Sequence, residues 1–138
     1  MELIETLYEE AHQNGVTVRQ GEIPVPHMDA AYLRTGHRAM IWIRQDGTQA
    51  ERACWLAEEL GHHNMSCGQV LRYDKVQDWK AEARARKWAH DRLLSRDAIL
   101  CAAENTDDIY EIAYALNVSV PFLREAIDDY KARGLWAL

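Results

Sequence analysis

Cysteine is scarce in this 138-residue chain, and long apolar runs are missing. Cys54, Cys67 and Cys101 are an odd number of cysteines without C-x-x-C spacing, which favours reduced, mostly buried thiols over a disulfide framework or a cysteine-rich zinc site. Its apolar runs, such as residues 39–43, are far too short to cross a bilayer, and the N-terminus lacks the features of a signal peptide. We therefore expect a cytoplasmic protein without a membrane partner.

Positive charge is also in short supply. The chain has 16 Lys and Arg against 22 Asp and Glu, which gives a formal net charge of -6. Because phosphate binding depends on clustered Lys and Arg, we do not expect nucleic acid to be the main partner. Low-complexity tracts, internal repeats and Pro/Gly/Ser linkers are missing as well. Together with the length, this predicts one domain over residues 1–138.

The first third of the chain carries signals for a helix and then a sheet. Apolar residues recur at helical spacing from Leu3 to Ala11, and Asn14-Gly15 is a typical helix end. Three β-rich segments follow, which is near the minimum for a stable sheet with a helix on one face. The predicted strands are residues 16–20, 30–33 and 38–43, with a Pro-containing loop at 22–26 and a Thr35-Gly36 turn.

The rest of the chain reads as helical. Thr48 and Glu51 form a T-x-x-E capping box that opens a helix over residues 48–63. A less regular stretch at 65–73 follows. Further helices are predicted at 76–93, at 96–104, at 107–116 with Thr106 as N-cap, and from Ser119 with Pro121 to a point before Gly134. The sequence therefore predicts an α+β fold: an N-terminal helix, a small three-stranded sheet and then a mostly helical bundle.

The helix over 48–63 carries the segment E-E-L-G-H, which reads as the zinc-protease signature H-E-x-x-H with its first His replaced. Residues four apart share one helix face, so Glu58 and His62 can bind one metal ion. Glu59 then lies beside the metal, where H-E-x-x-H enzymes keep their general base. A catalytic zinc has three protein ligands and a water, and Glu82 on the next long helix is the candidate for the third ligand.

Two segments, LAEELGHH and EARARKWAHDRLL, resemble the ImmA/IrrE family of metallopeptidases, whose second helix has the form E-x-x-A-x-x-F-A. Trp88 takes the aromatic position of that pattern, and Ala85 and Ala89 take the small ones. The resemblance extends over nearly the whole chain. It implies a single metallopeptidase-like domain with a minimal zincin-like site. Members are commonly encoded by phages and mobile elements, and phage-type members often show the E-E-L-G-H form.

The resemblance also implies an activity, namely zinc-dependent cleavage of a helix-turn-helix repressor as partner and substrate. By carry-over, Glu58, His62 and Glu82 would hold the metal and Glu59 would activate the water. A Glu in place of His lowers the net charge of the site, which weakens catalysis, and oxygen ligands make manganese an alternative to zinc. His63 or His90 could serve as an oxyanion stabiliser or as a hydrogen-bond partner of a ligand, although no spacing rule supports either residue.

Two other functional classes stay open. The Glu-for-His change allows a catalytically weak or silent antirepressor that only binds the repressor. Residues 109–123 resemble the core of a helix-turn-helix, which would suit a DNA-binding regulator. The second helix of that unit carries Glu125, Asp128 and Asp129, however, and such a face repels phosphate. The helix-turn-helix is therefore expected to be a packing unit of the domain, or a surface that grips the repressor, rather than a DNA reader.

Overall fold

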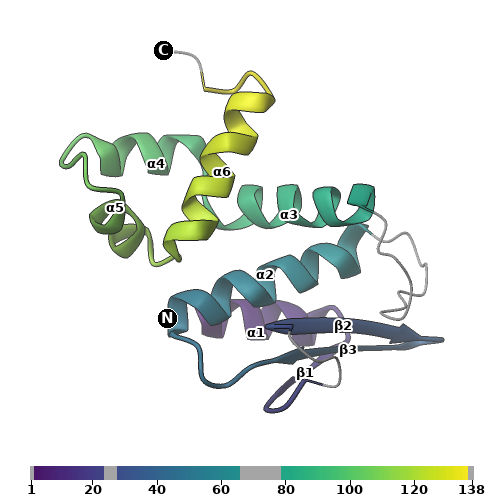
Figure 1. Cartoon of the computed structure of the whole chain (residues 1–138). Helices are drawn as coiled ribbons and strands as arrows, with labels where there is room; N and C mark the ends of the chain where they lie inside the picture. The colour runs from purple at the N-terminus through teal and green to yellow at the C-terminus, as the bar shows by residue number, and fades with distance from the viewer. Residues whose placement is uncertain (1, 24–27, 66–78, 137–138) are drawn as a thin grey trace.

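Two helices cover one face of a small sheet, and further helices stack beyond them (Figure 1). The computed structural model describes residues 2–23, 28–65 and 79–136. It confirms the predicted α+β layout. In chain order the elements are α1 Leu3–Gln13, β1 Val16–Gln20, β2 Ala30–Thr35, β3 Arg38–Ile43, α2 Gln49–Met65, α3 Trp79–Leu93, α4 Arg96–Ala103, α5 Ile109–Leu116 and α6 Val120–Ala132. Within the described ranges, no helix is long and apolar enough to span a membrane.

The sheet has the order β1-β3-β2, with β1 parallel to β3 and β2 antiparallel to it. The central strand β3 buries alternate residues, Ala39, Ile41 and Ile43, because successive side chains of a strand point to opposite faces. Helices α1 and α2 pack on the sheet, and α2 lies between the sheet and α3 (Figure 1). The edge strand β2 is therefore placed beside the helix that carries the E-E-L-G-H motif.

Local side-chain chemistry sets the helix ends. Helix α1 ends at Asn14, and Gly15 follows with the positive φ of 75° that favours glycine. The capping box at the start of α2 is confirmed: Glu51 N–H donates to Thr48 Oγ1 at 3.1 Å, and Thr48 N–H donates to Glu51 Oε1 at 2.9 Å. Ser119 likewise accepts a hydrogen bond from the backbone N–H of Phe122 at the start of α6.

The predicted N-cap of α5 is wrong. Asp108 rather than Thr106 caps this helix, and its carboxylate accepts the Tyr110 N–H at 2.9 Å. Thr106 accepts the Asp108 N–H at 3.1 Å and donates to Glu111, so it closes the preceding turn. Three other predictions lie outside the described residues: the loop at 24–26, the irregular stretch at 66–73 and the first three residues, 76–78, of the predicted long helix.

Helix α3 runs back along α2, and the two helices cross very closely at Gly61. A Cβ atom on Gly61 would lie 2.4 Å from the backbone oxygen of Ala85, which is far inside normal contact. Ala85 and Ala89 are themselves buried, with 1% and 0% of their surface exposed. Small residues on both helices therefore allow the approach that brings the beginning of α3 alongside the end of α2.

Candidate metal centre

The predicted site residues come from one face of α2 and from the first turn of α3. His62 Nε2 lies 3.2 Å from Glu82 Oε1, and both side chains are largely buried. The contact exists because Gly61, the residue before His62, lets α3 approach the backbone of α2. The structure therefore brings together two of the three predicted ligands, which lie 20 residues apart in the sequence.

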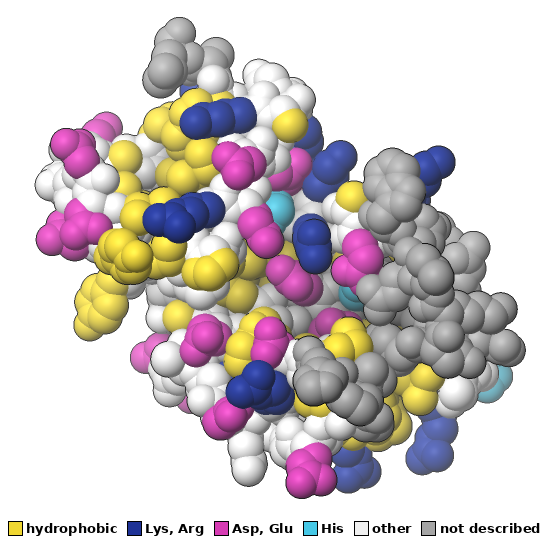
Figure 2. All heavy atoms as spheres, viewed as in Figure 1, with side chains coloured by type: hydrophobic (Ala, Val, Ile, Leu, Met, Phe, Trp, Pro, Cys, Tyr) yellow, Lys and Arg dark blue, Asp and Glu magenta, His cyan; other side chains and the backbone are white. Residues whose placement is uncertain are grey.

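Glu58 and Glu59 lie beside this pair, in a pocket of about 240 Å³ between the start of β2, α2 and α3. Glu59 is 8% exposed, and its Oε2 atom has no hydrogen-bond partner in the described part of the chain. In the middle of the face shown in Figure 2, acidic, basic and histidine side chains gather around a hollow. The pocket is lined by Met28, Asp29, Ala30, Trp55, Glu58, Glu59, Glu82 and Arg86.

The electrostatics of the pocket are those of carboxylates crowded together away from water. Burial raises the pKa of Glu58 to about 7 and that of Glu59 to about 8, and neighbouring carboxylates add to both shifts. Burial lowers the pKa of His62, but the hydrogen bond to Glu82 and the nearby carboxylates outweigh it, so the net shift is upward. The same hydrogen bond lowers the pKa of Glu82. A bound cation would relieve this repulsion and favour the ionised carboxylates.

The donor chemistry fits a divalent cation. Imidazole nitrogen and carboxylate oxygen are both zinc ligands, and oxygen-rich sets also suit manganese. In residues 2–23, 28–65 and 79–136, however, no three His, Cys, Asp or Glu side chains lie close enough together to form a ready metal site. His62 and Glu82 are in contact, whereas Glu58 lines the same pocket. The three-ligand set of Glu58, His62 and Glu82 thus stays a prediction.

Tyr32 of β2 lies beside His63 of the motif helix, and no sequence pattern singles this tyrosine out. Its side chain is fully buried, and its hydroxyl lies 2.7 Å from His63 Nδ1. Burial raises the pKa of Tyr32, the charge of Arg34 opposes this shift, and the charge of Glu59 adds to it. A tyrosine in a strand reads as a core residue, so only the pairing of β2 with β3 under α2 reveals this placement.

The two histidines proposed for supporting roles lie in different places. His63 packs its ring edge-to-face with Tyr32, and its role as an oxyanion stabiliser stays a prediction. His90 is 3% exposed and bonds through Nδ1 to Asp129 Oδ2 at 2.9 Å. It follows Glu82 by eight positions, which is about 12 Å along a helix. This distance favours a role for His90 away from the His62–Glu82 pair.

A motif helix packed on a small sheet, with a buried glutamate beside a His–Glu pair from two helices, defines a metallopeptidase-like domain. The chain belongs to the peptidase M78 family, since the family model described as the IrrE N-terminal-like domain matches residues 11–128. The match includes α2, α3 and all four predicted site residues, and it confirms the resemblance to the ImmA/IrrE family. No curated protein matches the chain.

Proposed function

We propose that the chain is a metal-dependent endopeptidase that cleaves a helix-turn-helix repressor of a phage or mobile element. The observation that supports it most is Glu59: a buried carboxylate with an unpaired oxygen, in the same pocket as Glu58 and Glu82. An unpaired buried polar atom costs about 1–3 kcal/mol, and a bound ion or a catalytic role is one explanation for its retention. The choice of a repressor as substrate rests on the family resemblance.

In the proposed mechanism, Glu58, His62 and Glu82 hold zinc, or alternatively manganese. The bound ion would supply Lewis acidity, which polarises a water molecule and the scissile carbonyl. Glu59 takes a proton from the water as its oxygen bonds to the carbonyl carbon. Glu59 then gives that proton to the leaving nitrogen as the C–N bond breaks, which leaves a carboxylic acid and an amine. The second proton of the water, now on the acid, passes to the amine or to solvent. Glu59 lines the same pocket as Glu58 and Glu82, which suits this role.

The edge strand β2 offers a path for the substrate backbone. Among the described residues it pairs with β3 alone, and Ala30 at its start lines the pocket together with Met28 and Asp29. An extended polypeptide can add to such an edge through backbone hydrogen bonds. A peptide bound there would run past Glu59, which supports a polypeptide substrate over a small molecule.

The test is incubation of the metal-loaded chain with the helix-turn-helix repressor encoded next to it, followed by mass spectrometry of the fragments. We expect cleavage at one site, and Glu59→Gln should lower the rate by about 100- to 10,000-fold, as loss of a general base does. Glu9→Gln makes the same chemical change on the exposed side of α1 and should leave the rate unchanged. Cleavage that survives Glu59→Gln would refute the assigned role.

A catalytically silent antirepressor is the second candidate. Two observations favour it. Position 58 holds Glu rather than His, and among the three proposed ligands, all in the described part of the chain, a direct contact is seen between His62 and Glu82. Tight binding of the repressor without cleavage, by the metal-loaded chain and by Glu59→Gln alike, would support it. A DNA-reading role fits less well, because Phe122, Leu123, Ala126 and Tyr130 of α6 are buried in the domain.

A further inference from the structure

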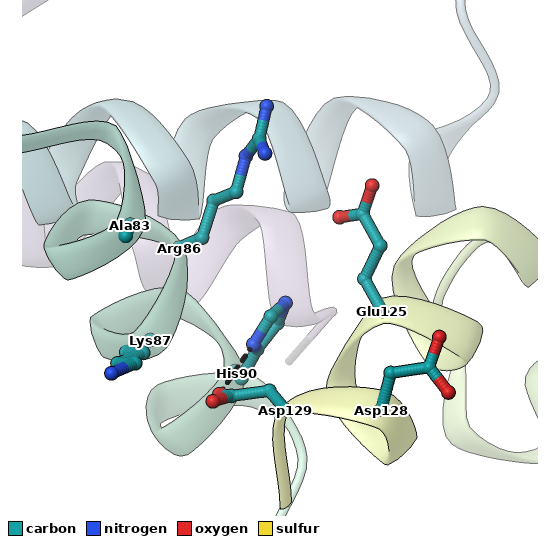
Figure 3. A pocket seen from close by; sticks show the side chains of 7 residues that line it. All are labelled: Ala83, Arg86, Lys87, His90, Glu125, Asp128 and Asp129. Atoms are coloured by element: carbon teal, nitrogen blue, oxygen red, sulfur yellow. Dashed lines mark hydrogen bonds and ion pairs between the residues drawn. The ribbon is translucent and has the colours of Figure 1, made fainter. Parts of the chain in front are cut away.

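A second pocket lies between α3 and α6 (Figure 3). Its volume is about 270 Å³, and Arg86, His90, Glu125 and Asp128 are among the residues that line it. That volume is below the range of about 300–1,000 Å³ typical of cofactor and drug-sized ligands. The pocket therefore suits a single side chain of a larger partner.

His90 is held in one orientation within this pocket. Its ring packs edge-to-face on Phe122 at 5.1 Å, and its Nδ1 lies 2.9 Å from Asp129 Oδ2. Asp129 also accepts a hydrogen bond from Arg133 at 2.8 Å, and an ionised carboxylate can only accept, so the Nδ1 atom of His90 carries the proton. In the neutral imidazole, Nε2 is then an acceptor.

The Nε2 atom of His90 is buried and has no hydrogen-bond partner in the described part of the chain. In Figure 3 the ring turns its Nδ1 side to Asp129 and its other nitrogen toward the space between Arg86 and Glu125. The wall of the pocket thus holds a buried nitrogen without a described partner, which is an acceptor when the imidazole is neutral. A ligand that donates a hydrogen bond there would satisfy it.

The charges around this space favour a neutral ligand. Arg86 and Glu125 flank it with one charge of each sign, whereas Lys87 and Asp128 point away from His90 (Figure 3). A charged side chain would be attracted by one flanking group and repelled by the other. A carboxamide carries an NH₂ that can donate to His90 and Glu125 and an oxygen that can accept from Arg86.

This pocket and the candidate metal centre lie along the same face of α3. Glu82, Arg86 and His90 are four residues apart and so lie along one face of α3. Arg86 lines both pockets. The span from Glu82 to His90 is about 12 Å along the helix, and an extended peptide rises about 3.3 Å per residue, so the span equals three to four substrate residues.

We propose that this pocket binds a glutamine or asparagine side chain of the polypeptide substrate, three or four residues from the cleaved bond. The inference rests on the proposed function, because it takes the peptide to pass from one pocket to the other. His90 is then a specificity-determining residue, positioned by Asp129 and Phe122.

Nuclear magnetic resonance of the full chain with labelled histidine tests the pocket. The probes are N-acetyl-glutamine amide and, as charged probes of similar length, N-acetyl-glutamate amide and N-acetyl-lysine amide. We expect the glutamine probe to shift the His90 Nε2 resonance saturably, and the charged probes to bind about five- to tenfold more weakly, as for one hydrogen bond left unmade. Equal binding of all three probes, or no shift of His90 with any, overturns the inference.

Exposed residues supply variants that keep the fold. Glu125→Gln removes the anion of the pocket, so binding should shift toward the glutamate probe, which Arg86 then attracts unopposed. Glu9→Gln, the matched change on α1, should leave the order of the probes unchanged. An unchanged order of probes in Glu125→Gln would also overturn the inference.

These measurements separate the pocket from the proposed function, because they need neither metal nor cleavage. If the glutamine probe binds as expected and the chain cleaves nothing, the proposed function fails and the pocket stands. If the repressor is cleaved but replacement of every Gln and Asn three or four residues from the cut site leaves KM and kcat unchanged, the pocket inference fails and the proposed function stands.

Discussion

Gly61→Ala is the substitution for which the structure and simple helix propensity disagree most sharply. Glycine is about 1 kcal/mol less favourable than alanine inside a helix, so propensity predicts a more stable protein. The added Cβ, however, would lie 2.4 Å from the backbone oxygen of Ala85 and 3.0 Å from its carbonyl carbon and Cα. Carbon atoms in good contact are about 3.5–4.0 Å apart, so α3 must move away by about 1 Å.

The clash should outweigh the gain in propensity. Overpacking costs about 1–3 kcal/mol, and the upper end applies because backbone atoms cannot rotate away as a side chain can. Subtracting the gain leaves a loss of about 2 kcal/mol in the free energy of unfolding. For a chain of this length that lowers Tm by about 8 °C. Glu82 moves with α3, so metal affinity should fall by about 10- to 100-fold, the usual effect of disturbing the support of a ligand.

Thermal unfolding followed by circular dichroism and zinc titration measure the two effects. Ala85→Gly removes a Cβ but leaves the carbonyl in place, so the double variant should not recover the stability that Gly61→Ala loses. Glu9→Ala on the exposed side of α1 should change stability by less than about 0.5 kcal/mol. An unchanged or higher Tm for Gly61→Ala refutes the close crossing. A lower Tm with unchanged zinc affinity refutes its link to the His62–Glu82 pair.

Two further predictions concern the ends and the core of α2. Thr48→Ala removes the acceptor of the Glu51 N–H and should cost about 1 kcal/mol in thermal unfolding; no loss would mean that the capping box contributes nothing. Burial raises the pKa of Cys54 to about 12, so at pH 8 it stays a neutral thiol. In a Cys67→Ser variant, a thiol reagent should label the exposed Cys101 quickly and Cys54 only after unfolding. Equal labelling rates of the two cysteines in the folded protein would contradict the burial of Cys54.

The parts of the fold that the sequence could predict depend on neighbours in the chain. Asn14-Gly15, the Thr48 and Glu51 pair and Ser119 act within one turn of helix, so their types and spacing suffice. The order β1-β3-β2 depends on which strands meet in space, and no local pattern records it. The error at Thr106 has the same origin, because two polar residues compete for one helix end and only the backbone geometry decides in favour of Asp108.

The candidate site also has a part that the sequence could predict and a part that it could not. Glu58, Glu59 and His62 follow from four-residue spacing on one helix, and Glu82 followed from a resemblance that the family match confirms. The contact of Tyr32 with His63 and the bond of His90 to Asp129 join residues far apart in the chain. Such contacts depend on how sheet and helices pack together, so the sequence alone could not place them.

The most direct test of the metal centre is the zinc content of the purified chain, measured by native mass spectrometry after zinc reconstitution. We expect one zinc ion per chain, retained in Glu59→Gln, which keeps all three proposed ligands. His62→Ala and Glu82→Ala should each lose the ion while circular dichroism shows an intact fold. A wild-type chain that holds no metal, or ligand variants that keep it, would contradict the assignment of Glu58, His62 and Glu82 as a metal centre.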